Sequence, residues 1–175
     1  MKTKFISIFT VLLLLGLSNS SCTQNSKNDS ATEQNTAVIL KDYGAESAVL
    51  NIDEYTLAND NFRVALWTGA NLQVTLMSIP VGGDVGLEQH LDIDQFLRIE
   101  DGEAKVLMGD SETELTFVQN ATADFAIFVP AGKWHNIVNT GNKPLKLYSI
   151  YAPVEHPKGT LHKTQEEAEE AEHHH

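Results

Sequence analysis

Short apolar stretches separated by turn-forming residues dominate the chain from about residue 45. In LQVTLMSI, the apolar residues Leu72, Val74 and Leu76 alternate with the polar residues Gln73 and Thr75. A period of two residues is typical of a β-strand with one face toward a core. Comparable stretches predict at least eight strands, namely FRVALW, LQVTLMSI, DQFLRI, EAKVLM, TELTFV, FAIFV, HNIVN and KLYSIYA.

Turn-forming pairs separate these strands. Asp101-Gly102 stands between DQFLRIE and EAKVLM and is typical of a tight hairpin, and Gly109-Asp110 and Gly141-Asn142 interrupt later runs. No helical period of useful length occurs before Lys163, after which TQEEAEEAE predicts one acidic surface helix. Many short strands with little helix predict an all-β sandwich, jelly roll or barrel, and a closed barrel has no exposed sheet edges.

The start of the chain follows a different pattern. Lys2 and Lys4 precede the apolar run FISIFTVLLLLGL, and the small-residue patch SNSSC follows it. This order is typical of a secretory signal peptide, which we expect at residues 1–21 of an exported, cell-envelope protein. A helix formed by this run would be about 20 Å long, shorter than the hydrocarbon core of about 30 Å, so a permanent membrane span is the weaker interpretation.

Cys22, the single cysteine, stands where this apolar run gives way to small residues. Its place resembles that of the lipidation cysteine of bacterial lipoproteins, although Asn19 replaces the usual leucine-like residue, and a free thiol is the alternative. The polar stretch TQNSKNDSATEQNT contains too little apolar surface to offset its ordering entropy. We therefore predict a flexible tether at residues 22–44, through which lipidated Cys22 would join the domain to a membrane.

Acidic residues outnumber basic ones across the 175 residues, 24 against 12, for a formal net charge of −12. No basic run follows the N-terminal segment, so the sequence predicts no nucleic-acid partner. Much of the acidity lies in the predicted C-terminal helix and is typical of a solvated face. His173–His175 are compatible with a tag remnant and are left out of the site assignment.

The stretch PAGKWHNIVN contains a regularly spaced motif. Pro130, Gly132, His135 and Asn139 form the pattern P-x-G-x-x-H-x-x-x-N. It resembles the second motif of the cupin family, G-x5-P-x-G-x2-H-x3-N, with Asp124 in place of the leading glycine. We expect Pro130 and Gly132 to shape the loop that leads to His135.

An earlier stretch resembles the first cupin motif, G-x5-H-x-H-x3,4-E-x6-G. Gly82, Glu88, His90, Gln95 and Gly102 keep its spacings, but a glutamate replaces the first histidine and a glutamine replaces the glutamate. The resemblance implies a cupin double-stranded β-helix, or jelly-roll barrel, over residues 45–155. A tail with a short acidic helix would follow at residues 156–175.

The resemblance also implies one divalent metal inside the barrel, held by Glu88, His90, Gln95 and His135. Two imidazoles, one carboxylate and one amide carry one negative charge, as do the three histidines and one glutamate of the usual set. Residues two apart on a strand share a face, so Glu88 and His90 would point inward, and a turn through LDID would bring Gln95 alongside on the neighbouring strand. Zinc is the first choice, with manganese, iron or nickel as alternatives, and Gln95 orienting a bound water is the alternative to direct ligation.

The same four donor types occur in cupin-type mannose-6-phosphate isomerases, with the Glu and Gln positions exchanged. The resemblance thus implies a metal-dependent enzyme on a small polar or sugar-like molecule. An iron-dependent dioxygenase is one alternative, because two histidines and a carboxylate bind iron(II) in oxygenases. A metal-binding or ligand-binding module without turnover is another, since a fold does not fix a reaction. Cupins commonly pair through their sheets, which leaves a homodimer open.

Four further polar residues lie outside this ligand set. Arg98 and Lys133 are candidate anion contacts, but isolated cations on strands and loops are usually solvated, and we expect that here. His156 and His162 follow the last predicted strand, and we expect them in an exposed loop rather than across the barrel mouth.

Overall fold

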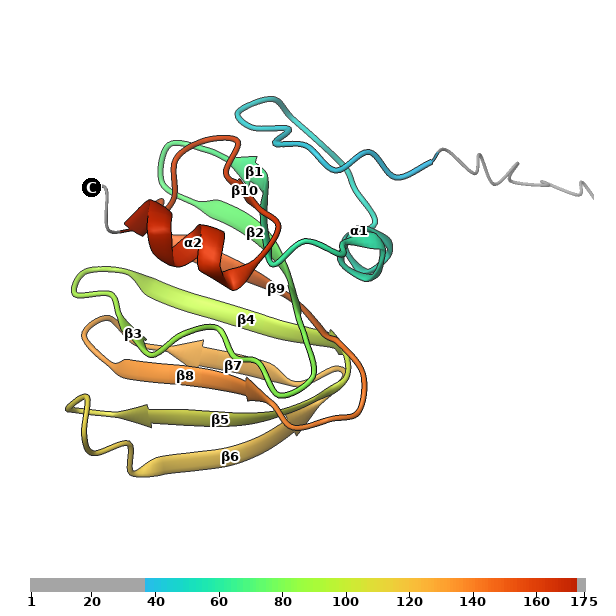
Figure 1. Ribbon diagram of the computed structural model, residues 1–175. Helices are drawn as coiled ribbons and strands as arrows, with labels where there is room; N and C mark the ends of the chain where they lie inside the picture. Colours follow the sequence, from blue (N-terminus) through green and yellow to red (C-terminus); the bar gives the residue numbers. More distant parts are fainter. Residues whose placement is uncertain (1–36, 173–175) are drawn as a thin grey trace, which may run out of the picture. The chain divides into compact units, whose positions relative to one another are not determined.

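Two antiparallel sheets make up most of the computed structural model, which describes residues 37–172 (Figure 1). The predicted signal peptide, Cys22, the first part of the predicted tether and His173–His175 lie outside the described residues. The six-stranded sheet contains, in spatial order, β10 (Leu161–His162), β1 (Arg63–Thr68), β2 (Gln73–Ile79), β9 (Leu145–Ala152), β4 (Asp94–Asp101) and β7 (Ala126–Val129). The four-stranded sheet contains β3 (Glu88–Gln89), β8 (Trp134–Asn139), β5 (Glu103–Gly109) and β6 (Phe117–Thr122). The all-β jelly-roll prediction is confirmed.

The Asp101-Gly102 step leads from one sheet to the other. β4 pairs with β7 and β9, whereas β5 pairs with β6 and β8. Gly102 has a φ of 102°, and a Cβ there would lie 3.0 Å from the Leu145 backbone, so only glycine fits this crossing well. The hairpin prediction is wrong because a turn signal marks a change of direction and does not select the strand that pairs next.

The inner faces of three neighbouring strands change from aliphatic to polar at nearly the same level. The change falls between Met77 and Thr75 on β2, Leu147 and Ser149 on β9, and Leu97 and Gln95 on β4. The aliphatic members belong to the main core cluster. The barrel interior therefore has an apolar end and a polar end, and the polar end is where ionisable groups can be held.

The alternation in LQVTLMSI does not follow the usual division between core and solvent. Gln73 and Thr75 are fully buried, whereas on the other face Leu72 is exposed, Val74 is half-buried and Leu76 is buried. The alternation rule assumes that polar side chains face water, and it fails on a strand whose inner face lines a polar interior.

The structure contains two helices in its described part, one of them unpredicted. α1 (Ile52–Ala58) begins after Asn51, whose side chain accepts a hydrogen bond from the Glu54 N–H. Its one buried residue is Thr56, so the sequence shows no apolar stripe that would predict a helix.

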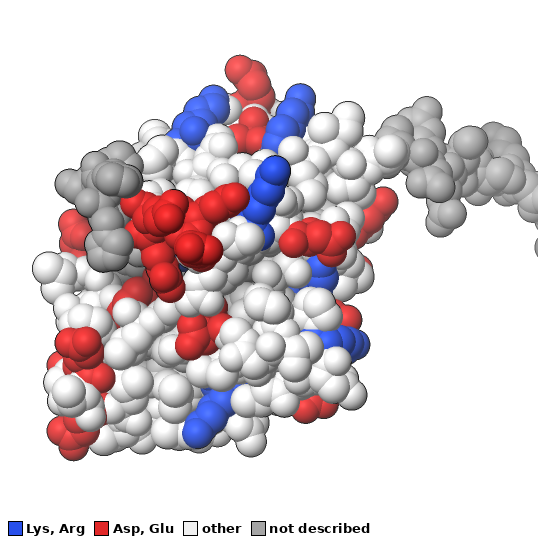
Figure 2. Space-filling view, viewed as in Figure 1, with Lys and Arg blue, Asp and Glu red and all other residues white. Residues whose placement is uncertain are grey.

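The second helix, α2 (Gln165–Glu172), is the predicted acidic helix, and its carboxylates gather in one surface patch (Figure 2). Its Ala168 is buried in the main core cluster, so the helix packs on the barrel. Neither helix in residues 37–172 has the length and apolar character needed to cross a membrane.

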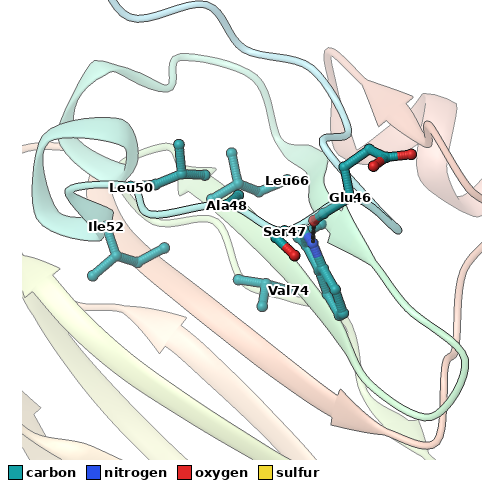
Figure 3. A pocket seen from close by; sticks show the side chains of 8 residues that line it. Glu46, Ser47, Ala48, Leu50, Ile52, Leu66 and Val74 are labelled. Carbon is teal, nitrogen blue, oxygen red and sulfur yellow. Dashed lines mark hydrogen bonds between the residues drawn. The ribbon is translucent and has the colours of Figure 1, made fainter.

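The segment before α1 packs against β1 and β2. A cavity of about 450 Å³ lies between residues 46–52 and these strands, and its lining is mostly apolar (Figure 3). The Trp67 indole N–H donates to the Glu46 carbonyl at 2.9 Å, and the Tyr43 N–H donates to the Leu66 carbonyl at 2.8 Å. Residue 43, placed in the tether by sequence, is thus bonded to β1.

Asp42 joins three segments of the domain. Its carboxylate accepts hydrogen bonds from the Gly44 N–H, from the N–H and hydroxyl of Thr68 and from the Gly159 N–H. Burial would raise the pKa of Asp42, but these hydrogen bonds outweigh it and hold the pKa below its ordinary 3.8. The stabilisation is therefore complete above pH 3.8 and is lost as the pH falls below it.

We expect Asp42→Asn to lower the free energy of unfolding by about 1–3 kcal/mol, because the amide has one acceptor oxygen and its NH₂ would face N–H donors. Thermal unfolding across pH tests this, with exposed Asp92→Asn as the control. The gap between wild type and Asp42→Asn should narrow as the pH falls below 3.8. If wild type and Asp42→Asn have the same melting temperature at neutral pH, Asp42 does not hold the three segments together.

Candidate metal centre

Glu88, His90 and His135 converge at the polar end of the barrel. Glu88 on β3 stands opposite His135 on β8, and His90 follows two residues after Glu88. One potential ligand atom from each lies within 4.8 Å of the other two. The Nε2 atoms of His135 and His90 lie 3.2 and 3.4 Å from the same Glu88 oxygen, Oε1. The structure thus brings together three of the four predicted ligands.

The far nitrogen of each imidazole is already engaged. His135 Nδ1 lies 3.1 Å from the Lys133 carbonyl oxygen, which can only accept, so Nδ1 donates. His90 Nδ1 lies 3.3 Å from Glu155 Oε1. If both rings carry their hydrogen on Nδ1, two Nε2 lone pairs face one carboxylate oxygen, and lone pairs cannot bond one another. A cation must lie among them, either added protons or a metal ion.

The pKa values of Glu88 and His90 are shifted in directions that also favour positive charge at this site. Burial would raise the pKa of Glu88, but the neighbouring His135 and His90 hold it far below its ordinary value. Burial would lower the pKa of His90, but the carboxylates of Glu155 and Glu88 raise it to about 9. A divalent metal would satisfy the same negative environment without added protons.

The surroundings of Gln95 bear on whether the donor set fits a metal. Its side chain is almost fully buried, and its Nε2 donates to Ser149 Oγ at 3.0 Å. Its Oε1 has no hydrogen-bond partner within the described chain, which is costly for a buried carbonyl. Two imidazoles, a carboxylate and a free amide oxygen fit zinc, manganese, iron or nickel. Direct ligation by Gln95 stays a prediction.

The expected route of Gln95 to the site is wrong. The sequence predicts Gln95 on a strand neighbouring that of Glu88, but β3 pairs with β8, and β4 lies in the six-stranded sheet. The two stretches of the first motif therefore occupy different sheets. The LDID turn joins strands that do not pair with each other.

Residues of the second motif hold the loop before His135. Gly132 has a φ of 79°, and its N–H donates to the His90 carbonyl at 2.7 Å, which ties the two histidine segments together. Asp124, at the place of the motif's glycine, has a φ of 71°. The Asn139 amide donates to the carbonyls of Ile79, Pro80 and Lys143, so it fixes the barrel rather than the site.

The two candidate anion contacts are engaged in ion pairs away from the donor group. Arg98 pairs with Glu100 and Asp124, and Lys133 pairs with Asp110. These contacts agree with the interpretation of both residues as surface cations.

Sequence reasoning missed residues that surround the donor group. Arg63 on β1 lies with Nη2 4.0 Å from Glu88 Oε2, on the inner face of an apolar strand. Tyr151 on β9 presents its ring edge-on to His90, with centroids 5.7 Å apart, and burial raises its pKa to about 12. An arginine at an inward position of an otherwise apolar strand was the available sequence signal for Arg63.

His156 lies inside the structure and not in an exposed loop as expected. Its ring packs edge-on against Tyr151 at 5.1 Å, and burial together with the Arg63 charge lowers its pKa to about 3. The Gln73 side chain holds its backbone, accepting from the His156 N–H at 2.9 Å and donating to its carbonyl at 2.8 Å. This pair of bonds folds the segment after β9 back onto the barrel.

Gln73→Ala should release that segment, because both His156 backbone groups lose their partner. We expect faster amide hydrogen exchange at His156 and a loss of about 1–3 kcal/mol in unfolding free energy. Gln119→Ala, on the exposed face of β6, is the matched control. An unchanged rate of amide exchange at His156 in Gln73→Ala would show that the two Gln73 hydrogen bonds do not hold the segment after β9.

Comparison with known proteins shows which family this two-sheet barrel resembles. Residues 75–151 match the family described as Cupin domain. The uncharacterized protein YrkC of Bacillus subtilis (strain 168) is 57% identical over 135 residues, which cover 77% of this chain and 73% of YrkC. The uncharacterized protein L612 of Acanthamoeba polyphaga mimivirus is 40% identical over 114 residues, 65% of this chain and 69% of that protein.

A solved structure agrees with these sequence matches. A crystal structure from Bacillus halodurans has 55% sequence identity and a TM-score of 0.74, and the match covers 74% of this chain and 98% of that one. The two-sheet barrel, the spacing of its two motifs and these similarities agree, and the chain belongs to the cupin family.

Proposed function

We propose that this cupin binds one divalent metal ion through Glu88, His90 and His135, with Gln95 as the fourth ligand, and acts as an enzyme on a small polar or sugar-like molecule. The observation that carries the proposal is the convergence of two imidazole Nε2 atoms on one carboxylate oxygen. A bound metal would supply Lewis-acid polarisation of a substrate carbonyl or hydroxyl. Zinc is the metal we expect first for this set of nitrogen and oxygen donors.

The chain's own residues would prepare this site before any metal arrives. The Lys133 carbonyl orients the His135 ring. The Ser149 hydroxyl oxygen accepts a hydrogen bond from Gln95 Nε2, which leaves Gln95 Oε1 free for a ligand. Arg63 lies beside the second oxygen of Glu88 and favours its charged form. These contacts point the donors inward at little further cost in side-chain entropy.

The composition of the donor group gives the dioxygenase alternative its own support. Two histidines and one carboxylate within 4.8 Å form the kind of set that holds iron(II) in oxygenases. Oxygen consumption by the iron-loaded protein with candidate diols or thiols separates the two reactions. Substrate-dependent uptake would favour the oxygenase, whereas isomer formation without uptake would favour the isomerase-like function.

Export and anchoring through a lipidated Cys22 are proposals that rest on the N-terminal sequence pattern. Mass spectrometry of the mature protein from a bacterial membrane fraction tests them. We expect an acylated N-terminal cysteine in the wild type and none in Cys22→Ser. Homodimer formation and a small-molecule ligand likewise stay predictions.

We expect His90→Ala and His135→Ala to lose most of the metal that the wild type retains after exhaustive dialysis, because each removes one of the converging nitrogens. Elemental analysis measures the metal per chain. His162→Ala, on β10 outside the donor group, is the matched control, and every variant keeps His173–His175. Metal content equal to wild type in both site variants would count against this site.

A further inference from the structure

Glu155 lies against the edge of the His90 ring that faces away from the donor group. Its Oε1 is 3.3 Å from His90 Nδ1, whereas His90 Nε2 is 3.4 Å from Glu88 Oε1. The two nitrogens lie on different edges of the imidazole, so one ring contacts a different carboxylate on each side. Glu155 is accordingly not a member of the group formed by Glu88, His90 and His135.

The segment that contains Glu155 is held at two points directly after this residue. The next residue, His156, has its backbone N–H and carbonyl bonded to the buried Gln73 amide. Further on, the Gly159 N–H donates to the Asp42 carboxylate at 2.9 Å. The Glu155 side chain is 29% exposed, so its carboxylate contacts His90 while part of the side chain still reaches solvent.

The two histidines of the donor group are supported in different ways. His135 Nδ1 donates to a backbone carbonyl, that of Lys133, which no side-chain substitution removes. His90 Nδ1 faces a charged side chain, which can be removed. A carboxylate on the far nitrogen of a ligand histidine fixes the ring orientation and the tautomer and increases the electron density on the ligating nitrogen.

We propose that Glu155 is a positioning residue for the metal site: it accepts the Nδ1 hydrogen of His90 and so presents the His90 Nε2 lone pair to the cation. This inference rests on the proposed metal-binding function. The residue comes from the segment after β9, beyond the stretch 75–151 that matches the cupin domain. That segment therefore contributes to the site as well as covering it.

The test compares zinc affinity, measured by competition with a chromophoric chelator, in Glu155→Ala and Glu155→Gln against the wild type. We expect the Kd of Glu155→Ala to rise about tenfold to a hundredfold. Glu155→Gln should fall between the two, because its amide oxygen still accepts a hydrogen bond but carries no charge. The control is Glu112→Gln, which is exposed in the β5–β6 connection and should bind as the wild type does.

A spectroscopic readout separates positioning from a loss of structure. In ¹⁵N-labelled zinc-loaded protein, we expect the His90 Nδ1–H signal to be sharp in the wild type, weakened in Glu155→Gln and lost to solvent exchange in Glu155→Ala. The His135 Nδ1–H signal should persist in all three, which also shows that the barrel is folded. Should Glu155→Ala not fold, the same comparison holds between Glu155→Gln and the wild type.

The outcomes are distinguishable. A wild type that takes up no zinc overturns the metal-binding proposal and this inference with it. A wild type that binds zinc, with variants at position 155 that bind equally well and keep the His90 Nδ1–H signal, overturns this inference alone.

Discussion

Two imidazole nitrogens and one carboxylate oxygen face each other inside a β-barrel, and that arrangement requires positive charge between them. The far nitrogens of His90 and His135 already face acceptors, which favours lone pairs on the two Nε2 atoms beside Glu88. Arg63 lies beside the other oxygen of Glu88, Oε2, so it does not separate Oε1 from the two Nε2 lone pairs, and the site is unfavourable unless protons or a metal lie among these three atoms. The proposed role of the free Gln95 oxygen and the proposed chemistry both depend on which cation does so.

The rest of the barrel offsets the free-energy cost of this arrangement. One end of the interior is filled by the aliphatic side chains of the core cluster, which stabilise the fold by burial. The other end carries Thr75, Ser149 and Gln95 on adjacent strands, where polar groups can orient the donors. The segment after β9 folds over this end and is fixed by Gln73 and Asp42. The apolar core and the candidate site thus lie at different ends of one interior.

Sequence spacing was sufficient for part of this account. Residues two apart on a strand share a face, which put Glu88 and His90 together. Their meeting with His135 was implied by the resemblance to the cupin motifs. Strand pairing was not accessible in the same way: Asp101-Gly102 marks a turn, but the choice between a hairpin and a change of sheet depends on contacts far along the chain. α1 was missed because its seven residues bury only Thr56. Glu155 and His156 reach the site through the return of the chain after β9, which no local pattern encodes.

The most direct test of the central claim is a crystal structure of the protein grown with zinc, with anomalous diffraction collected across the zinc absorption edge. The account predicts one anomalous peak among Glu88, His90 and His135, with the Gln95 Oε1 turned toward it and ligand distances of about 2.0–2.2 Å. A barrel interior without such a peak, or zinc bound only elsewhere on the chain, would contradict it.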